Sequence, residues 1–197
     1  KEDFINEVNK QGYTYPTELF FSVVPDTYQA YWTITPKKML NKLKEASDKF
    51  WQDKQETLQK SGYTKKEIIV LASIVNEETN KNDEKSRIAG VYVNRLKRGM
   101  PLQADPTIKF AVGDFSIKRI LHEHRTIVSP FNTYLNTGLP PAPICLPSVQ
   151  SLKKTLNYER HNYIYFCAKE DFSGYHNFAS NDRDHVNNAN RYRRALN

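Results

Sequence analysis

Glu78 has the clearest setting for acid–base chemistry in this sequence. It lies in the stretch LASIVNEET, where helical spacing places Leu71, Ile74 and Val75 on the same face of a helix as its carboxyl group. A carboxyl at the edge of an apolar stripe loses hydration, which favours the protonated form and prepares it to donate a proton near neutral pH. Glu77 points about a quarter turn away. The alternative, a solvated Glu in the last turn of a helix, stays open on this pattern alone.

Other residue types with catalytic chemistry form weaker patterns. His122, Glu123 and His124 are adjacent, and histidines alternating along a strand can bind a metal, but no further ligands follow at a recognised spacing. We therefore predict no metal site and no cofactor. The remaining histidines lack a Ser or Cys in a nucleophile elbow, and the sequence has no glycine-rich phosphate loop. A triad hydrolase and a nucleotide-dependent enzyme are both disfavoured.

Two predicted helices position Glu78 at the turn between them. Thr64 and Glu67 form a capping box, in which each side chain satisfies free backbone amides at a helix start, and the helix runs to about residue 79. After a polar break, a second helix is predicted over residues 84–98, with Gly99 as its stop.

The rest of the chain predicts an α+β fold that is helix-rich, with a small antiparallel sheet. We expect loops and short extended pieces in residues 1–35, because Tyr and Phe alternate there with Thr and Pro. The other expected elements are a surface helix over 36–60, a short helix over 105–113, a proline-rich loop over 129–147, a helix capped by Ser148, a buried strand over 163–168 paired with 175–179, and a polar helix over 182–195.

Composition fits one globular domain, which we assign to residues 1–197. The net charge of +7 favours an anionic partner, but Lys and Arg are scattered rather than gathered in one block, so most of them belong to solvated faces. Cys145 and Cys167 sit among apolar neighbours and are interpreted as small buried side chains, with a disulfide as the open alternative. No apolar run is long enough to span a bilayer and the sequence begins with Lys1, so we interpret it as an excised fragment whose anchoring segment is left out.

An ordered series of motifs carries a resemblance over nearly the whole chain. VPDTY, LASIVNEET, GVYVNRL, PLQADPT, SPFNTYLNTGLPPAPI and YHNF follow one another in the sequence. In this order they closely resemble the endolytic murein transglycosylases of the MltG type, also called YceG-like proteins. The resemblance implies that Glu78 is the catalytic acid/base. It further implies a cleft lined by Gln103, Asp105, Asn132, Thr133 and Tyr134, with His176 and Phe178 at its edge.

The function implied by the resemblance is cleavage of peptidoglycan glycan strands between N-acetylmuramic acid and N-acetylglucosamine, with formation of 1,6-anhydromuramyl ends. One carboxyl suffices for this reaction, whereas ordinary glycosidases pair two. Two alternatives stay open: a hydrolytic muramidase and a non-catalytic glycan-binding module. The resemblance also implies a single-pass anchor in the inner membrane, a catalytic domain in the periplasm or extracytoplasmic space, penicillin-binding synthases of the elongation machinery as partners, and no nucleic-acid partner.

Overall fold

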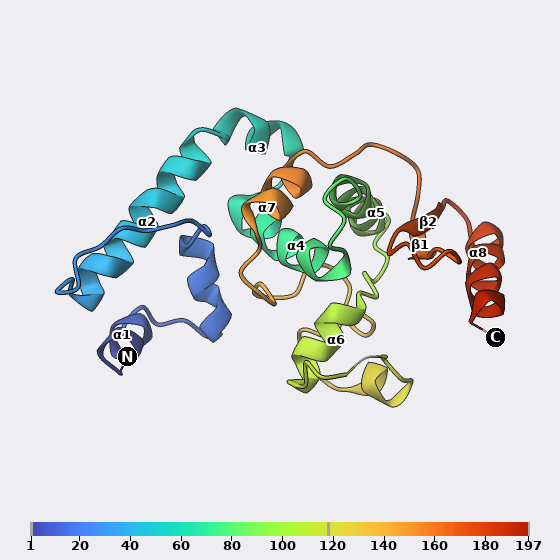
Figure 1. The fold of residues 1–197 in the computed structure, drawn as a ribbon, viewed down its shortest axis with the longest axis horizontal. Coiled ribbons are helices and arrows are strands. Elements are labelled where there is room, and N and C mark those ends of the chain that lie inside the picture. The colour runs from blue at the N-terminus through green and yellow to red at the C-terminus, as the bar shows by residue number, and fades with distance from the viewer. Residues whose placement is uncertain (1, 118, 197) are drawn as a thin grey trace.

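The computed structural model describes residues 2–117 and 119–196, and it confirms the helix-rich α+β class with a small antiparallel sheet. The helices α4, α5 and α7 lie at the centre, between a helical arm and a hairpin that carries the last helix (Figure 1). In the part of the chain described, no helix is both long and apolar enough to cross a bilayer. The elements in chain order are α1 (Glu2–Asn9), η1 (Pro16–Ser22), α2 (Pro36–Gln52), α3 (Gln55–Ser61), α4 (Lys65–Glu78), α5 (Lys85–Lys97), α6 (Asp105–Val112), η2 (Glu123–Thr126), α7 (Val149–Leu156), β1 (Tyr165–Ala168), β2 (His176–Ala179) and α8 (Asp182–Ala195).

The central helix α4 begins and ends close to where the sequence predicts. Its capping box is present: Thr64 Oγ1 accepts from the Glu67 backbone N–H at 3.2 Å, and Glu67 Oε2 accepts from the Thr64 N–H at 2.7 Å. Residues 68–75 are all buried, because one face of α4 packs with α5 and the opposite face with α7 and Trp51. Each fully buried aliphatic side chain contributes about 1.5–3 kcal/mol. Burial ends abruptly at the last turn, which leaves Glu78 at the edge of the core.

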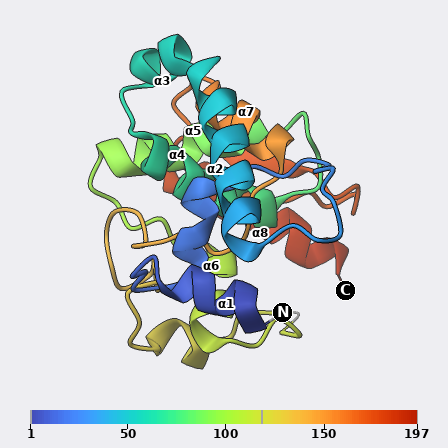
Figure 2. The ribbon, with the colours of Figure 1, turned by 90° about the vertical axis from the view of Figure 1, so that its left-hand side faces the viewer.

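The N-terminal region differs from the prediction of loops and extended pieces. Residues 2–9 form α1 and residues 16–22 form the 3₁₀ helix η1. Phe4 and Val8 lie one turn apart on α1, which packs against α2 at the lower end of the arm (Figure 2). The abundance of aromatic residues hid this helical spacing in the sequence.

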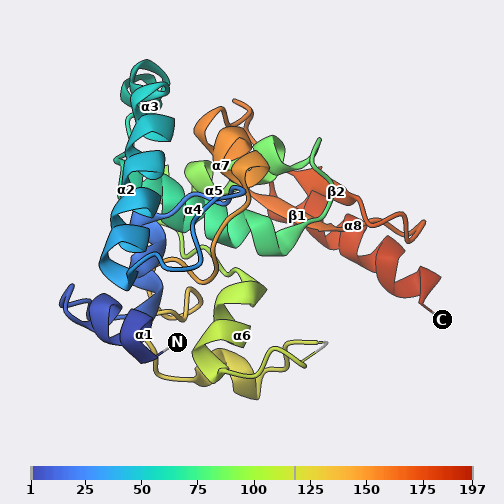
Figure 3. The ribbon, with the colours of Figure 1, turned by 60° about the vertical axis from the view of Figure 1, so that its left-hand side comes forward.

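The predicted helix over residues 36–60 is two helices, α2 and α3, that form the arm (Figure 3). The break falls at Asp53 and Lys54, just after the buried Trp51. Trp51 and Leu58 both pack on the cluster between α4 and α7. The break bends the chain around this cluster, whereas one straight helix would run past it.

The C-terminal hairpin is present, with shorter strands than predicted. β1 pairs antiparallel with β2, with Tyr165 opposite Ala179 and Ala168 opposite His176. The strand residues of β1 are partly exposed rather than buried, because α8 packs on the hairpin and no further strand extends it in the described chain. The hairpin lies beside α5, which β1 contacts (Figure 3).

The proline-rich loop over 129–147 is ordered by hydrogen bonds to the rest of the fold. The Ser73 hydroxyl on α4 accepts from the Ile144 N–H at 3.0 Å, and Pro101 forms an isolated antiparallel bridge with Thr137. The two cysteines are free and partly buried, Cys145 in this loop and Cys167 on β1. The disulfide alternative is therefore not realised in this structure.

Candidate active site

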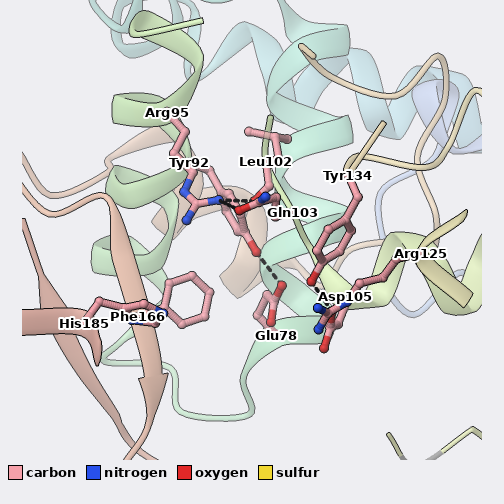
Figure 4. A pocket seen from close by; sticks show the side chains of 10 residues that line it. All are labelled: Glu78, Tyr92, Arg95, Leu102, Gln103, Asp105, Arg125, Tyr134, Phe166 and His185. Atoms are coloured by element: carbon pink, nitrogen blue, oxygen red, sulfur yellow. Dashed lines mark hydrogen bonds between the residues drawn. The ribbon is translucent and has the colours of Figure 1, made fainter. Parts of the chain in front are cut away.

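A cavity of about 360 Å³ opens where the end of α4 meets α5, the start of α6 and the hairpin (Figure 4). Side chains from seven segments of the chain line it: Glu78, Tyr92, Arg95, Leu102, Gln103, Asp105, Arg125, Tyr134, Phe166 and His185. Four of the eight residues proposed from the sequence are thus brought together here: Glu78, Gln103, Asp105 and Tyr134.

Glu78 is the last residue of α4, and its carboxyl group faces into the cavity (Figure 4). Burial raises the pKa of Glu78 from 4.5 to about 7, and the negative charge of Asp105 adds to this. A hydrogen bond donated by the Tyr92 hydroxyl to Glu78 Oε1 acts in the opposite direction, as do the charges of Lys109 and Arg95. The negative end of the helix dipole also disfavours an ionised carboxyl at this position. Near neutral pH, Glu78 can therefore both give and take a proton.

Two residues of α5 form the floor of the cavity. Tyr92 is 1% exposed, and burial together with the charge of Glu78 raises the pKa of its phenol, so it stays a hydrogen-bond donor. Arg95 lies one turn later on the same face, and its Nη1 donates to the carbonyl of Leu102 at 2.9 Å and to Gln103 Oε1 at 3.1 Å. Its Nε donates to the carbonyl of Ile164 at 2.7 Å. Arg95 thus ties the hairpin to the segment that carries Gln103.

Gln103 occupies a backbone conformation that is rare for a residue with a side chain, with φ of 51°. Such strain persists only where the surroundings fix it. The Gln103 N–H donates to the carbonyl of Thr133 at 3.0 Å, and Arg95 holds the side-chain oxygen. The amide of Gln103 is exposed at the mouth of the cavity, where it can hydrogen-bond a bound molecule.

Asp105 and Tyr134 line the wall opposite Phe166 and His185 (Figure 4). The Tyr134 hydroxyl donates to Asp105 Oδ1 at 2.5 Å, and the Arg125 guanidinium lies over the Tyr134 ring, 4.8 Å from its centroid. Burial and this hydrogen bond raise the pKa of Tyr134 above its usual range. The wall therefore combines a carboxylate, a phenol and a guanidinium next to the proton donor.

Asn132 and Thr133, which the resemblance places in the cleft, are not among the residues that line this cavity. Both are buried, and their side chains bond to the backbone. Asn132 Nδ2 donates to the carbonyls of Arg125 and Ile127 at 2.9 and 2.8 Å, and Thr133 Oγ1 accepts from the Ala104 N–H at 3.0 Å. They hold the loop that presents Tyr134 and Arg125, because a short polar side chain can replace missing backbone partners in a loop.

His176 and Phe178 also lie outside the lining of this cavity. The His176 N–H and Nδ1 bond to the two carboxylate oxygens of Glu84 at 3.0 and 2.9 Å, in a pair that is largely buried. Phe178 packs behind Phe166 and under the Arg87 guanidinium, 5.5 Å from its ring centroid. These contacts fix the hairpin against the start of α5, so both residues support the cavity wall from behind.

Sequence reasoning missed Tyr92, Arg95, Arg125 and Phe166, and it assigned no role to His185. Tyr92 and Arg95 carry a readable signal, since a polar residue and a cation lie three positions apart on the apolar face of a predicted helix. His185 stacks on Tyr165, with ring centroids 4.8 Å apart, and burial lowers its pKa from 6.5, which keeps it neutral. No local pattern marks the other residues.

Comparison with known proteins fits this geometry. A model of the YceG-like family matches residues 3–191, which is nearly all of the described chain. The chain belongs to the YceG-like family. Curated relatives of this YceG-like chain include the protein named endolytic murein transglycosylase of Bacillus subtilis, 31% identical over 82% of this chain, and its namesake in Streptococcus pneumoniae, 32% identical over 83% of this chain. The chain spans only 42% and 30% of the length of these two proteins.

A solved structure shares the fold. The crystal structure of a yceG-like protein from Listeria monocytogenes superposes with a TM-score of 0.77 at 28% identity, and the match covers 95% of this chain and 59% of that one. The arrangement of helices and hairpin around the cavity is therefore the fold of the YceG-like family.

Proposed function

We propose that this YceG-like chain is the catalytic domain of an endolytic peptidoglycan lytic transglycosylase, with Glu78 as its single acid/base. The observation that carries the proposal is a carboxyl group with a pKa of about 7 at the centre of a cavity rich in hydrogen-bonding side chains. The printed names of the curated relatives support murein as the substrate. Cleavage requires a group that is protonated when the substrate binds and accepts a proton later, which suits a pKa near the working pH.

The proposed reaction uses no water. Glu78 gives its proton to the oxygen between N-acetylmuramic acid and N-acetylglucosamine as the bond from that oxygen to C1 breaks. The muramyl C6 oxygen then bonds to C1, and its proton passes to the Glu78 carboxylate. The products are a glycan ending in 1,6-anhydromuramic acid and a free N-acetylglucosamine hydroxyl, and the enzyme returns to its starting state. The bond rearrangement balances within the substrate, so one protein carboxyl is enough.

The surrounding side chains have distinct roles in this proposal. The Tyr92 hydroxyl fixes one oxygen of the Glu78 carboxyl and leaves the other for the substrate. Gln103 offers an exposed amide that can orient a sugar through its hydroxyl or acetamido groups. The charge of Asp105 in the same cavity can stabilise the positive charge that develops at C1.

Asp105 also favours a second candidate, a muramidase that uses water. Glycosidases that hydrolyse their substrate usually place two carboxyl groups in the cleft, one as acid and one as nucleophile or base. Glu78 and Asp105 supply such a pair in one cavity. We rank this second, because one oxygen of Asp105 already accepts a hydrogen bond from the Tyr134 hydroxyl and is engaged with the protein rather than with a water.

The end groups of the product distinguish the two reactions. Glycan strands digested with the protein are analysed by mass spectrometry, with the Glu78→Gln variant as the control. The lytic transglycosylase yields anhydro ends, whereas the muramidase yields reducing ends that are heavier by one water. Full turnover by the Glu78→Gln variant would refute Glu78 as the acid/base in either reaction. We further propose that a membrane anchor holds the domain outside the cytoplasm, where murein lies. There it would act beside the penicillin-binding synthases of the elongation machinery.

A further inference from the structure

A second cavity, of about 320 Å³, lies on the other side of the junction between α4 and α6. Glu77 lines it, whereas Glu78 lines the first cavity, and Pro106 lines it, whereas Asp105 lines the first. Neighbouring residues have Cα atoms about 3.8 Å apart, so the two cavities flank the same two short stretches of backbone, one at the end of α4 and one at the start of α6. The positive charge of Lys109, which also lines the second cavity, lowers the pKa of Glu78. The two sites are therefore close enough to hold parts of one molecule.

The lining of the second cavity combines two opposite charges with apolar walls. In the chain as described, neither Glu77 nor Lys109 is in a salt bridge. Phe110 and Ile144 form the apolar side of the cavity. Phe115 also lines the cavity, and its side chain is 71% exposed to solvent. A volume of about 320 Å³ is at the lower end of the roughly 300–1,000 Å³ typical of small-ligand sites.

Cys145 also lines this cavity, and its thiol serves as part of the wall. Burial, followed by the charge of Glu77, raises the pKa of Cys145 to about 12. A thiol with so high a pKa stays protonated and is a poor nucleophile. Its Sγ donates to the carbonyl of Ser73 at 3.4 Å, which fixes the loop against α4. The chemistry of the cavity is thus recognition by charge and apolar contact, without a reactive group.

We propose that this second cavity binds the peptide that a muramyl residue carries, while its sugar lies against Glu78. The inference rests on the proposed function, since it needs a peptide-bearing glycan in the first cavity. A short peptide with a free carboxylate and a free ammonium group matches Lys109 and Glu77 in charge. Sugar rings match less well, because they are uncharged and favour amide and hydroxyl partners, which the first cavity offers and the second lacks.

The consequence is a preference for strands that still carry peptides. Peptide bound beside Glu78 would fix the register of the strand, so that cleavage falls next to a substituted muramyl residue. Strands stripped of peptides would bind through the first cavity alone. Lys109 and Phe115 are specificity residues in this scheme, and neither touches the reacting atoms.

Binding to the inactive Glu78→Gln protein tests the inference without cleavage. The probes are labelled, uncrosslinked glycan strands with intact peptides and the same strands after an amidase has removed them. We expect Lys109→Gln and Phe115→Ala, each added to Glu78→Gln, to weaken binding of peptide-bearing strands about three- to tenfold, as for the loss of a partly exposed ion pair or an aromatic contact. Binding of stripped strands should stay unchanged.

The controls are two exposed positions on and beside the helical arm: Lys37→Gln repeats the charge removal, and Trp32→Ala removes an exposed aromatic ring. They should leave binding of both strands unchanged. Equal affinity of the Glu78→Gln protein for the two strands would overturn the peptide site alone, as would an equal loss on both strands in the Lys109 and Phe115 variants. Failure to bind either strand would overturn the proposed function and the peptide site together.

Discussion

Replacing Glu78 with Gln removes one ionisable group from the cavity and leaves its shape nearly unchanged. The pKa of Glu78 is about 7 in the folded protein, against 4.5 for the same group in water. At 1.36 kcal/mol per pKa unit, the folded protein holds the ionised form with a penalty of about 3 kcal/mol. Glu78 keeps part of its surface exposed, so solvent reduces this figure. We expect a penalty of about 1–3 kcal/mol.

The sign of the effect depends on pH. Below pH 4.5, Glu78 is protonated in both the folded and the unfolded protein, so its titration does not change stability. Between pH 4.5 and 7 the unfolded chain loses this proton while the folded protein keeps it, and this group makes the protein less stable as pH rises. Above pH 7 the penalty is complete and constant. Gln has no such penalty, so the variant should be more stable than the wild type by about 1–3 kcal/mol at pH 8.5 and equally stable near pH 4.

Thermal unfolding of both proteins across this pH range measures the difference. For a chain of this size, about 1 kcal/mol moves Tm by roughly 2–4 °C, so the variant should melt about 3–10 °C higher at pH 8.5. The control is Glu45→Gln, the same change at an exposed position on α2, which should alter stability by less than about 0.5 kcal/mol at any pH. Equal Tm values for wild type and Glu78→Gln at pH 8.5 would show that Glu78 is solvated, and the reasoning from burial would fail.

Three further changes have defined outcomes. Tyr92→Phe removes the hydrogen bond that lowers the pKa of Glu78, so the alkaline limb of the pH–rate profile, near pH 7 in the wild type, should move to higher pH, with kcat about tenfold lower. Asp105→Asn removes a charge that raises the pKa of Glu78, so the alkaline limb should move to lower pH in this variant. If the alkaline limb moved in the same direction in Tyr92→Phe and in Asp105→Asn, the assigned interactions would be contradicted. Gly90→Ala would place a Cβ 2.3 Å from the carbonyl oxygen of Glu159, so urea denaturation should show a loss of about 1–3 kcal/mol or more, and an unchanged midpoint would contradict the close packing of α5.

Local chemistry explains why much of the fold could be read from the sequence. The capping box at Thr64 and the apolar stripe of α4 depend on residues within one or two turns, and both are as predicted. The break between α2 and α3 could not be read, because it depends on how Trp51 and Leu58 meet a cluster that α4 forms with residues of α7, about 100 positions later in the chain. Propensity within residues 36–60 is helical throughout, and packing overrides it.

The sequence by itself determined that the carboxyl group of Glu78 shares a helix face with an apolar stripe. An apolar stripe that ends in Glu78 already implies a desolvated carboxyl, because helical periodicity fixes which side chains share a face. Only the tertiary structure decided which groups surround it. Tyr92, Asp105, Arg125 and His185 come from four segments, and no local rule brings them into one cavity. The resemblance assigns Asn132 and Thr133 to substrate binding. In the folded protein the Asn132 amide and the Thr133 hydroxyl instead bond to loop backbone, since buried polar groups must find partners.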